Sequence, residues 1–232
     1  VALVLLVPAA LLVRRPPALD AVPQPGAALA APAMTARRAF ATPQFIVLAA
    51  TFFACCAAHS GPIFHTVSYA IACGLAPLAA VTIYSVEGLA GLGGRLLLGI
   101  AGDRYGAKPV LVAGLAVQAL AAGSYLFTRE ISEFYAVAIV FGLAYGGVMP
   151  LYSVLAREYF PLAIMGTILG ATAMISSLGM ALGPAIGGWI YDTQGEYAWL
   201  YIASAAIGLG AVAIALFFPP VPARATPALQ PA

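Results

Sequence analysis

Two charged residues stand inside a long apolar stretch of the chain. Glu87 and Arg95 are the only charges in residues 77–102. A carboxyl group there could take up and release a proton, and a guanidinium could bind a carboxylate through two parallel hydrogen bonds. A charge inside a hydrocarbon layer costs roughly 3 kcal/mol, which makes both residues functional candidates. On a helix the two lie about 12 Å apart along the axis and about 80° apart around it, so they could face one cavity from different depths.

Other interpretations of these two residues stay open. Arg95 could extend its guanidinium to the membrane interface, and Glu87 could be a protonated residue bonded to a neighbouring helix. His59, His65 and Tyr69 add further polar groups, with Gly61 and Pro62 between the histidines. We take Glu87 and His59 as candidates for proton coupling, because an imidazole titrates near neutral pH. His65 and Tyr69, four residues apart on one helix face, are candidates for substrate binding beside Arg95, although a packing role would equally explain each histidine.

Composition limits the class of protein that could hold these residues. Of 232 residues, 63% are hydrophobic and 8% charged, and the mean hydropathy is +1.00. Soluble domains carry roughly 25% charged residues, so a water-soluble globular fold is excluded. A net charge of +2 is too small for a nucleic-acid partner. The cysteines Cys55, Cys56 and Cys73 have no metal-binding spacing, and neither a metal nor a cofactor is expected.

The gaps between charges predict how often the chain crosses a bilayer, since one crossing needs about 20 apolar residues. We expect an all-α membrane protein with six transmembrane helices. Their predicted ranges are 44–72, 77–101, 109–128, 134–155, 162–190 and 197–218. The bilayer is therefore an expected partner of the chain.

The regions outside these helices have their own signatures. Residues 1–13 are apolar and stop at Arg14 and Arg15, which predicts the end of a truncated helix rather than a signal peptide. Residues 14–43 are rich in Pro and Ala and predict a linker, and residues 219–232 predict a tail. The six-helix bundle occupies residues 44–218, and the chain is expected to be part of a longer protein.

Cations predict the orientation, because Lys and Arg accumulate on the cytoplasmic side. With six spans, one side holds Arg14, Arg15, Arg37, Arg38, Arg104, Lys108, Arg157 and Arg224. The other side holds Arg129. We expect a multi-pass protein of the cytoplasmic membrane, with both ends of the bundle in the cytoplasm.

A short pattern occurs twice. Gly99, Asp103 and Gly106 end the second helix, and Gly188, Asp192 and Gly195 repeat the same spacing 89 residues later. On the predicted topology the copies face opposite sides. Two three-helix units of inverted orientation are a recurring plan of secondary transporters.

The first copy carries a resemblance to a known family. Gly99, Gly102, Asp103, Arg104, Gly106 and Lys108 form a segment that resembles the cytoplasmic loop signature of the major facilitator superfamily. The Gly166–Gly195 stretch also resembles that family's eleventh helix, so the chain resembles the C-terminal half of its twelve-helix fold. The resemblance implies that the signature forms a cytoplasmic gate, with Arg157 and Glu158 of the next loop as natural partners.

A finer resemblance concerns substrate. Residues 65–70, Gly74 and a lone Arg95 resemble the monocarboxylate porter and oxalate/formate antiporter group, in which this Arg binds the substrate carboxylate. Two departures stand out: Gly91 replaces the Asp of monocarboxylate porters, and residues 159–191 lack the Lys of oxalate antiporters.

The prediction is a secondary transporter that moves small organic anions, most of all monocarboxylates, as a symporter or antiporter coupled to protons. Its partners are the anion, protons, the bilayer and a missing N-terminal six-helix half. The alternatives are a facilitator carrier of another substrate, such as a drug or sugar, and a non-transporting membrane receptor or assembly protein. An enzyme is not expected, because the chain shows no nucleophile–base pair and no phosphate-binding loop.

Overall fold

The computed structural model describes residues 34–221. The predicted helix end over residues 1–13, most of the linker and most of the tail lie outside the described residues. Within them, α2 spans Ala36–Phe40, α3 Pro43–Ala72, α4 Pro77–Tyr105 and α5 Ala107–Ser124, followed by one 3₁₀ turn at Tyr125–Phe127. Helix α6 spans Ile131–Tyr159, α7 Met165–Gln194 after a 3₁₀ turn at Leu162–Ile164, and α8 Ala198–Leu216.

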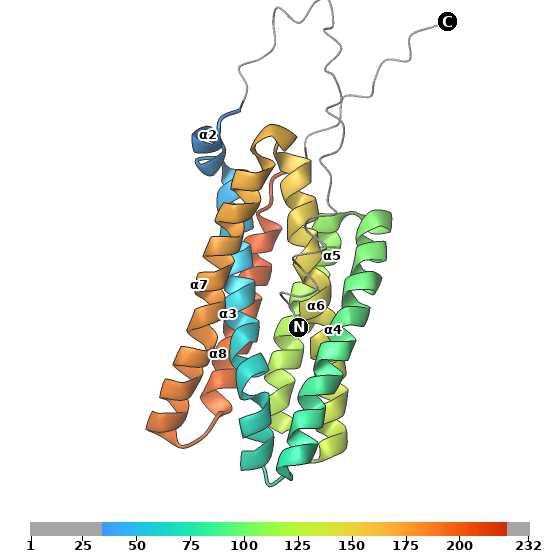
Figure 1. Cartoon of the computed structure of the whole chain (residues 1–232), viewed down its shortest axis with the longest axis vertical. Coiled ribbons are helices and arrows are strands. Elements are labelled where there is room, and N and C mark those ends of the chain that lie inside the picture. Colours follow the sequence, from blue (N-terminus) through green and yellow to red (C-terminus); the bar gives the residue numbers. More distant parts are fainter. Residues whose placement is uncertain (1–33, 222–232) are drawn as a thin grey trace, which may run out of the picture. The chain divides into compact units, whose positions relative to one another are not determined.

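The six long helices lie side by side as an upright bundle (Figure 1). Each is long and apolar enough to cross a membrane. Residues 34–221 contain no strand. The predicted all-α fold with six membrane helices is therefore confirmed, and the helix ends differ from the predicted ones by a few residues. Helices α4 and α6 are longer than predicted, because the polar residues at their ends continue the helix.

The predicted linker contains one short helix that the sequence did not indicate. Residues 36–40 form this helix, α2. Thr35 begins it by accepting a hydrogen bond from the Arg38 backbone N–H at 3.4 Å. Thr42 begins α3 in the same way with Phe45 at 3.3 Å, and a Thr at this position satisfies an otherwise unpaired donor.

Three of the connections between helices contain a glycine with a positive φ angle. Gly74, Gly106 and Gly195 have φ angles of 93°, 92° and 73°. Such angles are unfavourable for a residue with a Cβ and natural for glycine. Gly106 and Gly195 are the last members of the repeated pattern, so the pattern marks the sharp turns after α4 and α7.

The packing of the helices has an internal pseudo-symmetry. Helix α4 packs mainly on α6, and α7 packs mainly on α3. The next largest contacts join α3 with α8, α5 with α6, and α5 with α8. Exchanging the first three helices with the last three converts α4–α6 into α7–α3 and α3–α8 into α6–α5, and it leaves α5–α8 unchanged. The bundle therefore consists of two inverted three-helix repeats, α3–α5 and α6–α8, as predicted.

Small residues allow the main pairs to approach closely. A Cβ on Gly142 would collide with the Glu87 backbone, and one on Gly146 with the Gly91 backbone, so α4 and α6 meet at glycine. Gly179 and Gly183 of α7 face the α3 backbone in the same way. Close approach at small residues is typical of membrane helices, whose association has no hydrophobic driving force.

Two apolar clusters fill the bundle, one in each half of its length. One contains Leu48, Leu111 and Leu155, and the other contains Tyr125, Phe141 and Tyr201. Buried polar residues that belong to neither cluster include His59, Glu87 and Gln118. These three side chains come from α3, α4 and α5.

Candidate functional site

Glu87 lies inside the bundle with an incomplete set of hydrogen bonds. Its side chain is 1% exposed. Oε2 accepts a hydrogen bond from the Tyr125 hydroxyl at 3.3 Å, and Oε1 has no partner among the described residues. A buried carboxyl group whose oxygens are not all hydrogen-bonded is unfavourable, so Glu87 stands out among the polar residues of the bundle interior.

Tyr145 of α6 was not predicted as a site residue, yet its hydroxyl lies beside the turn of α4 that separates Glu87 from Arg95. A Cβ on Gly91 would lie 3.4 Å from the Tyr145 hydroxyl. Gly91 is one helical turn from Glu87 and one turn from Arg95, so the hydroxyl lies over the turn between them. The absence of a side chain at Gly91 leaves this space to the tyrosine. The only signal in the sequence was a phenol placed among glycines in an apolar span.

Arg95 and Glu87 do not face the same side of α4 in the described bundle. Arg95 is exposed, whereas Glu87 is buried. The expectation that both could line one cavity is therefore not met within residues 34–221. By helix geometry Arg95 lies about 15 Å from the α4 end at Tyr105 and Glu87 about 15 Å from the end at Pro77. Both residues are thus far from either end of the span.

His59 belongs to the same level of the bundle. Its side chain is 1% exposed, and its ring centroid lies 5.5 Å from that of Tyr145. Nδ1 lies 3.8 Å from Cys55 Sγ. Gln118 Nε2 donates to the Cys55 carbonyl at 3.4 Å. These contacts connect α3, α5 and α6 around the Glu87 level, although His59 and Glu87 are not bonded to each other.

The structure does not bring His65 and Tyr69 to Arg95. His65 Nε2 lies 3.1 Å from the Pro184 carbonyl of α7. The Tyr69 hydroxyl donates to the Tyr125 carbonyl at 3.0 Å. Tyr69 is one turn from the end of α3, and 1.5 Å per residue places it roughly 20 Å from Arg95 along the bundle. Both side chains lie in an aromatic cluster with Tyr197, away from Arg95 in the described bundle.

The predicted gate residues surround the turn from α4 to α5. Asp103 and Arg104 are exposed, and the Arg104 guanidinium lies 5.5 Å from the Tyr105 ring centroid. A Cβ on Gly102 would lie 2.9 Å from Leu151 Cδ2 of α6. Gly99 faces open space, with nothing within 4 Å of the position that a Cβ would take. The turn therefore holds α4 against α6 and leaves its charges accessible.

Lys108 has a partner that the sequence did not suggest. Nζ donates to the Phe218 carbonyl at 2.6 Å and to the Leu216 carbonyl at 3.4 Å, at the end of α8. A cation there satisfies free carbonyls and interacts favourably with the helix dipole. Arg157 is exposed and Glu158 half-buried. Within the described part of the chain, neither forms an ion pair or a hydrogen bond with Asp103, so the expected pairing is not observed.

These features define a class of protein: a multi-pass helical bundle of two inverted repeats with isolated charges inside its spans. Comparison with known proteins agrees. The chain matches the Major Facilitator Superfamily over residues 1–184 and again over residues 88–232. The chain belongs to the Major Facilitator Superfamily.

The individual relatives differ in the activities that their names describe. The chain is 36% identical over 107 residues to the Bacillus subtilis protein "Uncharacterized MFS-type transporter YuxJ", covering 43% of this chain and 26% of that protein. It is 28% identical over 127 residues to "Bicyclomycin resistance protein homolog" of Haemophilus influenzae, covering 55% and 32%. It is 25% identical over 166 residues to "Monocarboxylate transporter 12" of Xenopus laevis, covering 70% and 36%.

The matches cover about a quarter to a third of each of these relatives. Family membership confirms the predicted superfamily, the multi-pass membrane character and the expectation of a transporter family rather than an enzyme. It does not select among substrates, because drug-resistance and monocarboxylate proteins both match.

Proposed function

We propose that this chain is the C-terminal half of a twelve-helix transporter that carries small organic anions, preferably monocarboxylates, across the cytoplasmic membrane by alternating access. Arg95 binds the carboxylate and Glu87 exchanges a proton, so that transport is a proton-coupled symport or an anion antiport. The observation that carries the proposal is the arrangement on α4, where the Tyr145 hydroxyl lies over Gly91 between the two charges.

Arg95 supports an anionic substrate. Contact with water at a membrane surface does not explain a guanidinium that lies far from both ends of a span. Because Arg95 is exposed, its guanidinium is free to bind a ligand carboxylate through two hydrogen bonds. Arg95 is the one cation that lies far from the ends of the described spans, and one cation suits one carboxylate better than two. The relative of Xenopus laevis named as a monocarboxylate transporter agrees with this substrate class.

Glu87 supports coupling to protons. Its Oε1 has no hydrogen-bond partner among the described residues and is therefore available to exchange a proton. In the monocarboxylate porters that the chain resembles, the acidic residue stands at the position of Gly91, one turn before Arg95. In this chain the carboxyl group is that of Glu87, two turns before Arg95. Tyr145 spans the added turn, and we assign it the task of relating the protonation of Glu87 to the occupancy of Arg95.

The turn after α4 supports alternating access. Asp103, Arg104 and Arg157 are exposed at the end predicted to be cytoplasmic, where the missing half can pair with them in one conformation and release them in the other. Lys108 ties the same turn to α8. We therefore propose that the gate closes on the other half of the protein and not within this bundle.

The second candidate is a carrier of uncharged or cationic drugs. The match to a bicyclomycin resistance homologue favours it, as does the mainly apolar surface of the spans. On that alternative Arg95 has no substrate carboxylate to bind, and its removal leaves transport intact.

The deciding experiment is uptake of labelled lactate and pyruvate by the full-length protein in proteoliposomes. Loss of one hydrogen bond to a charged group weakens binding by about 2 kcal/mol, or roughly thirtyfold, so Arg95→Ala should reduce uptake by at least that factor. Arg95→Lys should retain part of it. The matched control is Arg37→Ala, which removes an exposed cation outside the spans. Uptake of neither anion, or equal uptake by Arg95→Ala, would overturn the proposal.

A further inference from the structure

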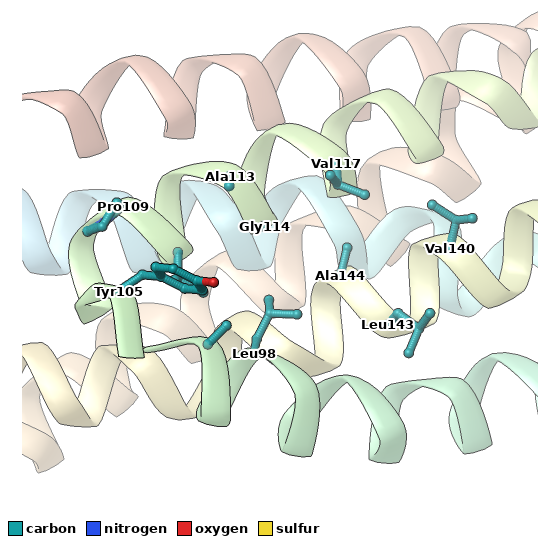
Figure 2. Close-up of a pocket in the computed structure, with 11 residues that line it drawn as sticks. Leu98, Tyr105, Pro109, Ala113, Gly114, Val117, Val140, Leu143 and Ala144 are labelled. Atoms are coloured by element: carbon teal, nitrogen blue, oxygen red, sulfur yellow. The ribbon is translucent and has the colours of Figure 1, made fainter. Parts of the chain in front are cut away.

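The two halves of the bundle differ in the polarity of the side chains that face inward. In the half that contains the α4–α5 turn, an apolar groove of about 500 Å³ lies between α4 and α5, with Leu98, Ala113 and Leu143 among its lining residues (Figure 2). The described residues that line this groove carry no charge. In the other half, several buried hydroxyl groups gather around Glu87. The groups that could bind a polar ligand therefore lie in the Glu87 half.

Two buried oxygen atoms in that half have no hydrogen-bond partner among the described residues. One is Glu87 Oε1, and the other is the hydroxyl oxygen of Tyr201 in α8. Both side chains are buried, and a buried polar atom without a partner is unfavourable. The third such atom within residues 34–221, Thr51 Oγ1, belongs to the other half of the bundle. Glu87 and Tyr201 therefore form the place where two free polar atoms occur together.

Tyr125 connects these two side chains. Its hydroxyl donates to Glu87 Oε2 at 3.3 Å, and its ring centroid lies 5.2 Å from that of Tyr201, with 36° between the ring planes. The Thr66 hydroxyl of α3 donates to the Pro62 carbonyl at 2.6 Å and lies near the hydroxyls of both tyrosines. Hydroxyl groups from α3, from the end of α5 and from α8 thus meet at the carboxyl group of α4.

Tyr69 is close to this group of hydroxyls, but its own hydroxyl is already used. Its ring centroid lies 4.8 Å from that of Tyr201. The Tyr69 hydroxyl donates to the Tyr125 carbonyl at 3.0 Å and accepts from Arg129 Nη1 at 3.5 Å. A phenol has one proton to donate, so Tyr69 has none left for Glu87. Of Tyr69, Tyr125 and Tyr201, the hydroxyl of Tyr201 alone is without a partner in the described chain.

Other titratable groups near Glu87 do not bond to Oε1. The side chains that surround it from α3, the end of α5, α6 and α8 are His59, Tyr69, Tyr125, Tyr145 and Tyr201. On α4 itself, Tyr84 and Arg95 are the neighbouring titratable residues, and Arg95 is about 12 Å away along the axis. Within residues 34–221 none of these groups donates a hydrogen bond to Oε1.

We propose that one water molecule binds between Glu87 Oε1 and the Tyr201 hydroxyl, and that Tyr201 positions this water for exchange of the Glu87 proton. A buried water typically forms about three hydrogen bonds. This one accepts from the Tyr201 hydroxyl and donates to Glu87 Oε1 and to Thr66 Oγ1. A proton that leaves Oε1 passes to the water oxygen, and the reverse transfer returns it. The role in exchange rests on the proton coupling of the proposed function, whereas the water site itself does not.

Infrared spectroscopy of the full-length protein at acidic pH tests the water site. The carbonyl stretch of a protonated carboxyl group falls in wavenumber when its oxygen accepts a hydrogen bond, and the Glu87 band is the one that disappears in Glu87→Gln. In Tyr201→Phe this band should move to higher wavenumber. Tyr197→Phe is the matched control, because it removes another buried hydroxyl one turn nearer the start of α8, and it should leave the band unchanged.

An unmoved band in Tyr201→Phe, or an equal shift in Tyr197→Phe, would overturn the water site. Thermal unfolding gives an independent answer. A hydroxyl that holds a water contributes a hydrogen bond, so its removal should lower the unfolding temperature. A higher unfolding temperature in Tyr201→Phe would mean that an unpaired polar group had been removed, and would also overturn the site. If Tyr201→Phe does not fold, Thr66→Val removes another partner of the water and should shift the same band.

Transport measurements test the role of Tyr201 in proton exchange. Net anion uptake by proteoliposomes under a proton gradient requires Glu87 to release its proton, whereas exchange of internal for external anion does not. Tyr201→Phe should lower net uptake by about fivefold, which corresponds to one neutral hydrogen bond of about 1 kcal/mol, and should leave exchange unchanged.

The results separate this inference from the proposed function. If Glu87→Gln loses net uptake and Tyr201→Phe keeps it, the role of Tyr201 is wrong and the proton coupling at Glu87 stands. If Glu87→Gln keeps proton-driven uptake, or loses no carboxyl band, the proton coupling itself is wrong. The unfolding temperature of Tyr201→Phe still decides the water site in that case.

Discussion

Helices α4 and α7 occupy equivalent places in the two repeats and differ in chemistry. Both are long, at 29 and 30 residues, and both end at a glycine with positive φ. They are also the two spans with the smallest buried fractions. Helix α4 carries Glu87 and Arg95 inside its span, whereas α7 has no charge between Met165 and Tyr191.

The equivalent positions show what replaces the charges. With the offset of 89 residues set by the repeated pattern, Ser176 corresponds to Glu87 and Pro184 to Arg95. Ser176 donates its hydroxyl to the Ala173 carbonyl of its own helix at 2.9 Å. Helix α7 thus satisfies its polar groups locally, while α4 leaves a carboxyl oxygen without a partner. The packing of both repeats uses small residues at the helix contacts and does not use Glu87 or Arg95, which agrees with the transport roles proposed for these two charges.

The largest expected effect tests the part that the repeats share. Gly146→Ala and Gly183→Ala each place a Cβ against the backbone of a neighbouring helix, α4 and α3 respectively. Overpacking of this kind costs about 1–3 kcal/mol and more where backbone cannot move, so both variants should lose most of the folded protein. The measurement is the yield of monodisperse protein together with its thermal unfolding.

Gly88→Ala and Gly170→Ala are the matched controls, because nothing lies within 4 Å of a Cβ at either position. Both should be as stable as the original protein or more stable by about 0.5–1 kcal/mol, since alanine favours helix. If only one of Gly146→Ala and Gly183→Ala destabilises the protein, the two repeats are not packed in the same way.

The second prediction tests the difference between the repeats. Glu87→Gln should abolish the dependence of anion uptake on a pH gradient, because an amide cannot exchange a proton. The fold should be retained, since an incompletely bonded buried carboxyl contributes no stability that the amide lacks. The other titratable groups around this level of the bundle include His59, Tyr125, Tyr145 and Tyr201. Uptake is measured in proteoliposomes with and without an inward proton gradient.

Ser176→Ala is the matched control in α7. It removes one local hydrogen bond, and its uptake and pH dependence should equal those of the original protein. If uptake by Glu87→Gln still responds to the proton gradient, or if uptake by Ser176→Ala no longer does, the placement of proton coupling in α4 is wrong.

A smaller effect is expected for the residue between the charges. Tyr145→Phe keeps the ring beside His59 and removes the hydroxyl over Gly91. A hydrogen bond to a charged group is worth about 1.5–3 kcal/mol, so the KM for the anion should rise by roughly 10- to 150-fold with little change in stability. Tyr135→Phe, which loses a 2.6 Å contact to Thr82 Oγ1, serves as the control. An unchanged KM in Tyr145→Phe would remove this residue from the site.

The smallest effect concerns the turns that follow the two helices. Lys108→Gln removes a cation from the carbonyl end of α8 and should lower the free energy of unfolding by about 0.5–1 kcal/mol. Lys108→Arg should recover most of the loss. At the equivalent position Tyr197 stacks on Tyr191 with ring centroids 4.5 Å apart, so the α7 turn relies on aromatic packing. If Lys108→Gln unfolds at the original temperature, the contact to Phe218 adds no stability to the turn.

Much of the fold could be predicted from the sequence for a simple reason. A residue inside a bilayer is restricted in charge, so the uncharged runs mark the spans, and the repeated glycine and aspartate pattern marks their ends. The six helices were predicted correctly on that basis. The short helix α2 was missed, because a Thr cap and five helical residues give too weak a signal in a segment rich in Pro and Ala.

The candidate site could be predicted only in part. The scarcity of charge was enough to select Glu87 and Arg95, because both can be recognised within a single span without knowledge of the other helices. The sequence could not show that Glu87 faces the interior and Arg95 does not. An angle of about 80° around the helix axis allows the two side chains to share one environment or to lie in different ones. His65 and Tyr69 looked like members of the same site from spacing alone, and their distance from Arg95 became visible only when α3 and α4 were placed side by side.

The sequence by itself determined that this protein is a membrane bundle of six helices, with two inverted units and two isolated charges. These properties follow from local restrictions, namely solvation of charge along one chain and the backbone freedom of glycine. Tertiary structure decided which helices pair, that Tyr145 fills the space left by Gly91, that Lys108 belongs to α8, and that a groove remains between α4 and α5. These features depend on contacts between residues far apart in the chain, which the pattern of one helix does not contain.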